Sequence, residues 1–296
     1  MQTTAQAEAR ATVRETAQVL SDVRRLAKPR QLPIPSTSLR MPAPLAEEEP
    51  QRALTLRLLH HGEVRLKMYL WLRWYAQHVP DPKADPRSSF AERVRVARTG
   101  GSTHAGMRLS HCEWAHLLAL PEPATNGAKR VGAALAQLEE RGLVSRSSDR
   151  PAHVVPTDQK SWPSRPAESN GGYAALPVGF FVGQWAGGLT GRAIGSLLIL
   201  IDRANPRISM PKADYGPPTY VAESVLKGTY GVSEDFFRQG RQELAKVGLV
   251  SCGLNKRWAR EEGGWGGVES TLVVKKLREE AHPRFAGEDG RDIFPP

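Results

Sequence analysis

The sequence predicts a mainly α-helical protein with small β-hairpins (class α+β), built as two similar units in tandem. Residues 138–145 read LEERGLVS and residues 244–251 read LAKVGLVS. In both phrases a helical pattern ends at a glycine, which tolerates the positive φ common just past a helix, and an apolar pair suited to a strand follows. A polar helix and a second short helix precede each phrase. Such repetition indicates a duplicated unit.

Composition bounds the class of protein and its partners. The 296 residues suit about two domains of ordinary size. Lys and Arg outnumber Asp and Glu by 41 to 31, which favours an anionic partner, nucleic acid first and acidic membrane second. Cys112 and Cys252 fall in different halves and are expected to be reduced thiols. With no apolar run of membrane-spanning length and no signal peptide, we expect a cytoplasmic, nucleoid-associated protein without a membrane partner.

Shifts in composition predict the organisation of the chain. The predicted segments are an N-terminal arm with a Pro-rich linker (1–50), a first unit (51–160), a linker (161–172), a second unit (173–283) and a mobile tail (284–296).

The clearest helix of the first unit is predicted over residues 62–78. A single face carries Val64, Met68, Trp71, Leu72 and Tyr75, which we expect to be core. The pattern places its cationic side chains on other faces, namely Arg65, Lys67 and Arg73.

Two short helices and a hairpin should follow in that unit. Ser110 and Glu113 have the spacing of a capping box, which begins a short helix. Thr125 or Asn126 is expected to cap the next helix. The inward positions of that second helix are Val131, Leu135 and Leu138, and residues 143–146 are predicted to pair with residues 153–155.

The second unit is predicted to use the same order of elements. Its predicted elements are a strand at 176–181, an apolar helix capped by Thr190, a short helix at 220–229, a turn at 231–233, a second helix at 234–247 with Phe236 among its inward positions, and paired strands at 250–254 and 270–277.

The candidate binding residues lie on the outward face of each second helix and on the hairpin tips. A helix in a DNA major groove needs long donors, because Arg bonds guanine edges and Gln or Asn bonds adenine edges. The helix candidates are Asn126, Lys129, Arg130 and Gln137 in the first unit and Arg238, Arg241 and Gln242 in the second. The tip candidates for phosphate or minor groove are Arg150 and then Lys256, Arg257 and Arg260. The alternative is a solvated helix face, and Glu234 and Asp235 count slightly against DNA at the start of the second helix.

Enzyme chemistry is not predicted. The sequence has no G-x-x-x-x-G-K-[ST] phosphate loop. His111, Cys112 and His116 lie close together but lack a third and fourth metal ligand at workable spacing. Gly195-Ser196-Leu197 lacks the second glycine of a nucleophile elbow. We therefore expect no catalysis, no metal and no cofactor.

Residues 109–155 and 220–277 each resemble a winged helix-turn-helix in helix order and in the shared phrase. Two tandem copies, each with a helix ahead, are similar in architecture to iteron-binding plasmid replication initiators. The resemblance implies a sequence-specific protein that binds double-stranded DNA with one recognition helix per half-site and wings on the flanking backbone. It also implies a possible homodimer. A transcriptional regulator fits the same residues, and so does a winged-helix module that binds protein partners instead of DNA.

Overall fold

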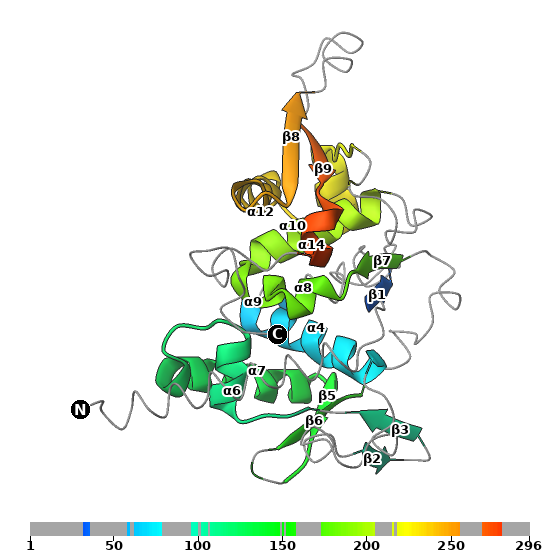
Figure 1. The fold of residues 1–296 in the computed structure, drawn as a ribbon. Coiled ribbons are helices and arrows are strands. Elements are labelled where there is room, and N and C mark those ends of the chain that lie inside the picture. Colours follow the sequence, from blue (N-terminus) through cyan, green and yellow to red (C-terminus); the bar gives the residue numbers. More distant parts are fainter. Residues whose placement is uncertain are drawn as a thin grey trace, which may run out of the picture.

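The computed structural model describes the following residues: 32–35, 58–59, 62–78, 96–99, 102–105, 107–148, 150, 152–157, 173–204, 215, 218–254 and 268–279. This part is mainly helical with small antiparallel sheets, as predicted (Figure 1). The predicted linker 161–172, the tail 284–296 and nearly all of the arm 1–50 lie outside the described residues.

The first half runs from the N-terminal strand to the first hairpin. Its elements are β1 (Leu32–Pro35), α4 (Glu63–His78), β2 (Val96–Thr99), β3 (Ser102–Ala105), β4 (Met107–Arg108), α6 (His111–Leu117), the π-helical turn η2 (Pro123–Gly127), α7 (Ala128–Glu140), β5 (Val144–Arg146) and β6 (His153–Pro156).

The second half begins at the strand that pairs with β1. Its elements are β7 (Tyr173–Leu176), α8 (Gly179–Val182), α9 (Trp185–Gly188), α10 (Gly191–Arg203), α11 (Glu223–Val225), the π-helical turn η4 (Leu226–Tyr230), α12 (Glu234–Lys246), β8 (Val250–Leu254), β9 (Val268–Leu272) and α14 (Val274–Glu279).

The same order of elements occurs twice. In the first unit α4 is followed, after the β2–β3 hairpin, by β4, α6, η2 with α7, and the β5–β6 hairpin, and the sheet order is β4-β6-β5. In the second unit α10 is followed by the extended residue Thr219, α11 with η4, α12, and the β8–β9 hairpin. Thr219 bridges Ser270 of β9, so this sheet also places the first extended segment beside the last strand. The two hairpins lie at opposite ends of the molecule in Figure 1.

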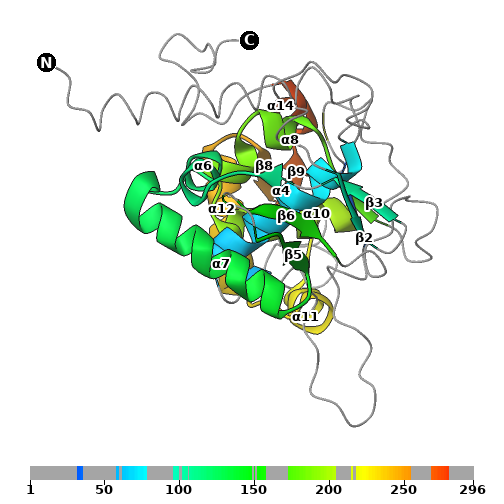
Figure 2. The same ribbon diagram turned by 90° about the horizontal axis from the view of Figure 1, so that it is seen from below.

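Helix α4 occupies the middle of the molecule and contacts α7 and β6 on one side and α9 and α10 on the other (Figures 1 and 2). Its predicted core face is confirmed, since Val64, Met68, Trp71, Leu72 and Tyr75 are all buried. The other faces of the helix are covered as well, because three cationic side chains are also buried: Arg65, Lys67 and Arg73. A helix that is covered on all sides must bury its polar face too, and Arg73 accordingly donates to the Tyr69 hydroxyl at 2.8 Å.

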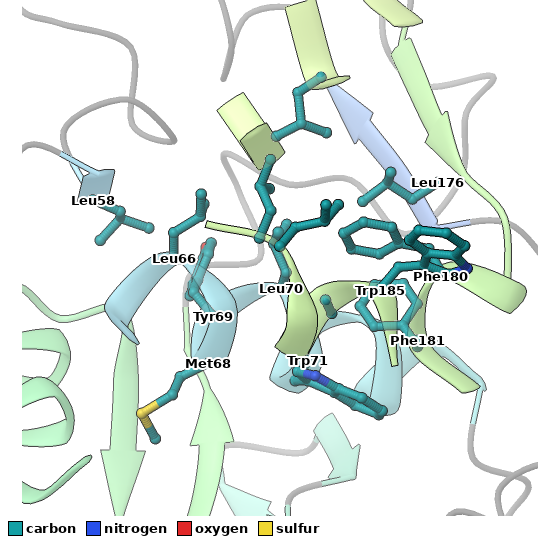
Figure 3. Close-up of a cluster of buried hydrophobic side chains, with 14 of the residues drawn as sticks. Leu58, Leu66, Met68, Tyr69, Leu70, Trp71, Leu176, Phe180, Phe181 and Trp185 are labelled. Carbon is teal, nitrogen blue, oxygen red and sulfur yellow. The ribbon is translucent and has the colours of Figure 1, made fainter. Parts of the chain in front are cut away.

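Aromatic side chains join α4 to the second half of the chain (Figure 3). The Trp74 ring stacks on Phe181 with centroids 5.0 Å apart, and Trp71 meets the same ring edge-on at 5.2 Å. The buried apolar side chains of both halves form one continuous core cluster. The two predicted units therefore share a core through α4.

Two strand predictions in the second half require correction. Residues 176–181 are not a strand: β7 ends at Leu176, and Pro177, which has no amide hydrogen, precedes helix α8. That helix brings Phe180 and Phe181 into the core. The predicted strand at 270–277 is shifted to Val268–Leu272, and helix α14 follows it and buries Leu277.

The segment Leu32–Pro35 was predicted to be part of an extended linker. It is extended, but it is also paired with another strand. It forms an antiparallel two-stranded sheet with β7, in which Leu32 faces Leu176 and Ile34 faces Ala174. Leu32 and Ile34 are fully buried, so this segment belongs to the core.

Candidate nucleic-acid interface

The turn between α6 and α7 sets the start of the first candidate binding helix. The predicted capping box is confirmed: Ser110 Oγ accepts from the Glu113 amide, and the Ser110 amide donates to the Glu113 carboxylate at 2.6 Å. After α6, Ala119 and Glu122 both adopt positive φ, of 53° and 48°. Non-glycine residues seldom adopt this conformation, so the turn is strained.

The predicted cap of the second helix is wrong. Thr125 and Asn126 lie within η2, which continues directly into α7, so no side chain caps the helix at either residue. Instead both side chains donate to the Glu122 carboxylate, Thr125 at 3.2 Å and Asn126 at 2.7 Å. The candidate base-reading amide of Asn126 is therefore held by an acidic neighbour.

The outward and inward faces of α7 are as predicted. Val131, Leu135 and Leu138 are buried, and the four candidate residues on the outward side are exposed: Asn126, Lys129, Arg130 and Gln137. Arg150, beyond β5, is exposed as well. After the helix, Gly142 adopts φ 66°, which confirms the expected role of the first repeated glycine.

Helix α12 repeats this arrangement with its own cap. Ser233 Oγ accepts from the Phe236 amide at 3.1 Å, and Gly248 beyond the helix has φ 72°. The inward aromatic residue is Phe237, which is buried, whereas the predicted Phe236 is only half-buried. Phe237 shares the inward face with Gly240 and Leu244, which lie three and seven residues further along the helix.

The three candidate residues of α12 differ in their surroundings. Arg238 and Gln242 are exposed as predicted. Arg241 is half-buried, and its guanidinium lies 5.8 Å from the centroid of the Phe237 ring. Arg241 is therefore packed along the helix surface by a cation–π contact as well as offered to solvent.

At the start of each candidate helix, one carboxylate accepts hydrogen bonds from two neighbouring side chains. The sequence did not predict this feature. In α12 the Asp235 carboxylate pairs with Arg238 and accepts from Gln239 Nε2 at 2.6 Å. In the first unit Glu122 holds Thr125 and Asn126 in the same way, at the same spacings of three and four residues. The Arg238–Asp235 pair is exposed at both side chains, and exposed pairs contribute at most about 1 kcal/mol. A polyanion can therefore displace these carboxylates.

The two hairpins are only partly described. In the first, Arg146 of β5 forms an ion pair with Glu139 in the last turn of α7, and hydrogen bonding from Arg146 lowers the pKa of that carboxyl. The pair links the end of α7 to the hairpin. The second set of tip candidates, Lys256, Arg257 and Arg260, lies outside the described residues.

The N-terminus of α10 joins α4 to α12 through two carboxylates. Glu243 of α12 accepts from the Thr190 amide at 2.8 Å and from the Thr190 hydroxyl at 2.5 Å. Glu63 of α4 accepts from the Gly191 amide at 2.9 Å and lies 3.6 Å from the ammonium of Lys67. Thr190 itself caps α10 as predicted.

Lys67 is buried at this junction. Its side chain is 4 % exposed, and it donates to the Gly187 carbonyl at 2.9 Å. Burial lowers the pKa of Lys67, and the neighbouring Glu63 carboxylate opposes that change. If Lys67 is to stay charged here, the Glu63 carboxylate must offset the free-energy cost of burying the ammonium group.

Helix α12 also packs unusually close to α10. A Cβ at Gly240 would overlap Ser196 Oγ and the Arg192 carbonyl oxygen, and would lie 2.8 Å from the Arg192 carbonyl carbon. Glycine at this position lets the two helix backbones touch, and this contact sets the distance between α12 and α10.

Beside this contact the surface is hollowed into a groove of about 800 Å³. It lies between the starts of α4 and α10 and one face of α12, and its lining residues include Leu59, Glu63, Arg192, Val232, Phe236, Gln239, Gln242, Glu243 and Lys246.

In the described residues, no group of three His, Cys, Asp or Glu side chains is placed to hold a metal ion. Burial lowers the pKa of His116 and raises that of Cys112, the changes expected of packed side chains. No helix in this part of the chain has the length and apolar character of a membrane span. No protein-family model, curated protein or solved structure matches the chain.

Proposed function

We propose that the protein binds double-stranded DNA in a sequence-specific manner through two tandem winged helix-turn-helix units, as a replication initiator or a transcriptional regulator. The observation that carries the proposal is the repeated order of elements. Both units have a core helix, a short extended segment, two helices joined by a tight turn, and a hairpin whose last strand pairs with that segment. In a winged helix the second of those helices enters the major groove.

The placement of the two second helices supports this proposal. In both views α7 and α12 lie toward the same side of the molecule, so a single duplex can meet both (Figures 1 and 2). The outward residues of α7 include Lys129, Arg130 and Gln137, and those of α12 include Arg238 and Gln242. These side chains are the types that reach phosphates and base edges.

Salt dependence is the first test. Duplex binding that neutralises several phosphates is expected to weaken steeply as salt rises, with a slope of about −0.9 for each phosphate in a log–log plot. Replacing Arg238 and Arg241 together by alanine should reduce affinity for a selected site by about tenfold or more, because a base contact is worth about 1–3 kcal/mol. Fluorescence anisotropy with selected and random duplexes measures both effects.

The matched control removes two exposed charges elsewhere, by Arg203→Ala with Lys227→Ala. We expect this variant to keep its preference for the selected site. Equal loss in both variants would mean that α12 does not read bases. Duplex binding that is absent or insensitive to salt would instead favour the protein-partner module.

Asp235→Asn is expected to increase affinity for random duplex by about two- to fivefold, because the substitution frees Arg238 from its ion pair and removes a charge that repels phosphate. Discrimination between selected and random duplex should fall. Anisotropy titrations at one fixed salt concentration give both quantities.

Glu234→Gln is the control for that experiment, since Glu234 is an exposed neighbour in the same helical turn and has no hydrogen bond to the described residues. It removes the same charge without releasing Arg238. A similar increase from both variants would show that net charge alone sets random-duplex affinity.

A further inference from the structure

The groove beside α12 has the size and lining of a small-molecule site. Its volume of about 800 Å³ falls within the range of ligand pockets. Leu59, Val232 and Phe236 give it an apolar part, and polar side chains from α10 and α12 surround that part. The ligand class follows from which of those polar groups are already occupied.

The two carboxylates in the groove are occupied by protein donors. Glu63 accepts from the Gly191 amide and pairs with Lys67, so its charge is compensated. Glu243 accepts two hydrogen bonds from Thr190 at the positive end of α10. Neither carboxylate is therefore available to hold a cationic ligand.

The donors in the groove remain available. Gln242 and Lys246 are exposed and form no hydrogen bond with the described residues, and Arg192 bonds only Gln239 among them. Gln242 and Lys246 lie four residues apart on α12, so they project from one face of that helix. Two cations and an amide next to an aromatic ring form a site for an anion with an apolar group.

We propose that this groove binds a small organic anion that carries a ring or short apolar chain. The acid group is held by Arg192, Gln242 and Lys246, and the apolar part lies against Phe236 and Leu59. Because Gln242 is also a candidate base contact, the bound anion competes with DNA; this consequence rests on the proposed function, whereas the binding itself does not.

The probe is 2-naphthoate, compared with its neutral analogue 2-naphthamide, and calorimetry on the full chain gives both affinities. Naphthoate is expected to bind at least about tenfold more tightly than naphthamide, because hydrogen bonds to charged groups are the stronger ones. Arg192→Gln with Lys246→Gln should abolish that difference. Arg203→Gln with Lys227→Gln, outside the groove, should leave it unchanged.

Two results would overturn the proposal: equal affinity for acid and amide, or equal loss in the groove variant and in its control. Phe236→Leu provides a second check, since it keeps the apolar volume but should weaken naphthoate by about two- to tenfold through the lost ring contact. A thermal melt of each variant verifies folding. Naphthoate binding by a protein that binds no duplex would refute the proposed function alone, and duplex binding without naphthoate binding would refute the groove site alone.

Discussion

Gly240→Ala is expected to lower the free energy of unfolding by up to about 2 kcal/mol, although alanine is the better helix former. Propensity alone would stabilise α12 by about 1 kcal/mol. The added Cβ, however, meets the backbone carbonyl of Arg192 in α10, which cannot rotate away as a side chain can. Overpacking of this kind costs about 1–3 kcal/mol when helices must move apart, and here it must also offset the propensity gain. Urea unfolding curves measure the change.

Gly228 provides the matched control. It lies in η4, and nothing is within 4 Å of the position where its Cβ would be. Gly228→Ala should therefore raise stability by up to about 1 kcal/mol. If both substitutions stabilise the protein equally, α12 does not depend on close backbone contact with α10. If Gly240→Ala destabilises as expected, it should also weaken duplex binding, because α12 is moved outward.

Glu63→Ala is expected to destabilise the protein by about 3 kcal/mol near neutral pH, because it leaves the buried Lys67 ammonium without its carboxylate. The substitution also removes the acceptor of the Gly191 amide at the start of α10. Chemical denaturation at several pH values gives the magnitude and its pH dependence.

The pH dependence follows from the direction of the Lys67 shift. Burial lowers the pKa of Lys67 from its ordinary value of 10.5, and removing Glu63 lowers it further. Between the folded and unfolded pKa values the unfolded chain holds more protons, so stability rises with pH in that window. The loss of stability caused by Glu63→Ala should therefore be largest at pH values where Lys67 is charged in both the folded and the unfolded state. This loss should shrink as the pH rises toward 10.5.

Two variants separate charge from hydrogen bonding. Glu63→Gln keeps an oxygen that can accept a hydrogen bond from the Gly191 amide, but it lacks the negative charge. It should therefore show only the pH-dependent part of the loss of stability, which comes from Lys67. Adding Lys67→Met to Glu63→Ala removes the uncompensated ammonium and should recover part of the stability. A double variant no more stable than Glu63→Ala would show that Lys67 is not the cause.

Local signals in the sequence predicted several helix ends correctly. The Ser110 capping box, the Thr190 cap and the two repeated glycines act within a few residues, and each is confirmed. The inward positions of α7 followed from helical periodicity for the same reason. The tertiary placement of charged residues was not accessible in this way.

Several features that the sequence did not predict have a non-local origin. Lys67 belongs to a polar face by periodicity, yet it is buried because Gly187 and Glu63 meet it at the junction of α4 and α10. Phe180 and Phe181 read as strand residues, but they lie on helix α8, where Phe181 packs against Trp71 and Trp74 of α4. The groove is formed by segments widely separated in sequence, and no pattern within one segment could have indicated it.

The pairing of β1 with β7 has a consequence for how the chain matures. Leu32 meets Leu176, so the first strand acquires its partner only after about 140 further residues have left the ribosome. Closing so long a loop is slow, and until then Leu32 and Ile34 lack the part of their native cover that β7 provides. A nascent chain stalled before Tyr173 thus displays an unsatisfied strand edge, a ready target for chaperones and for self-association.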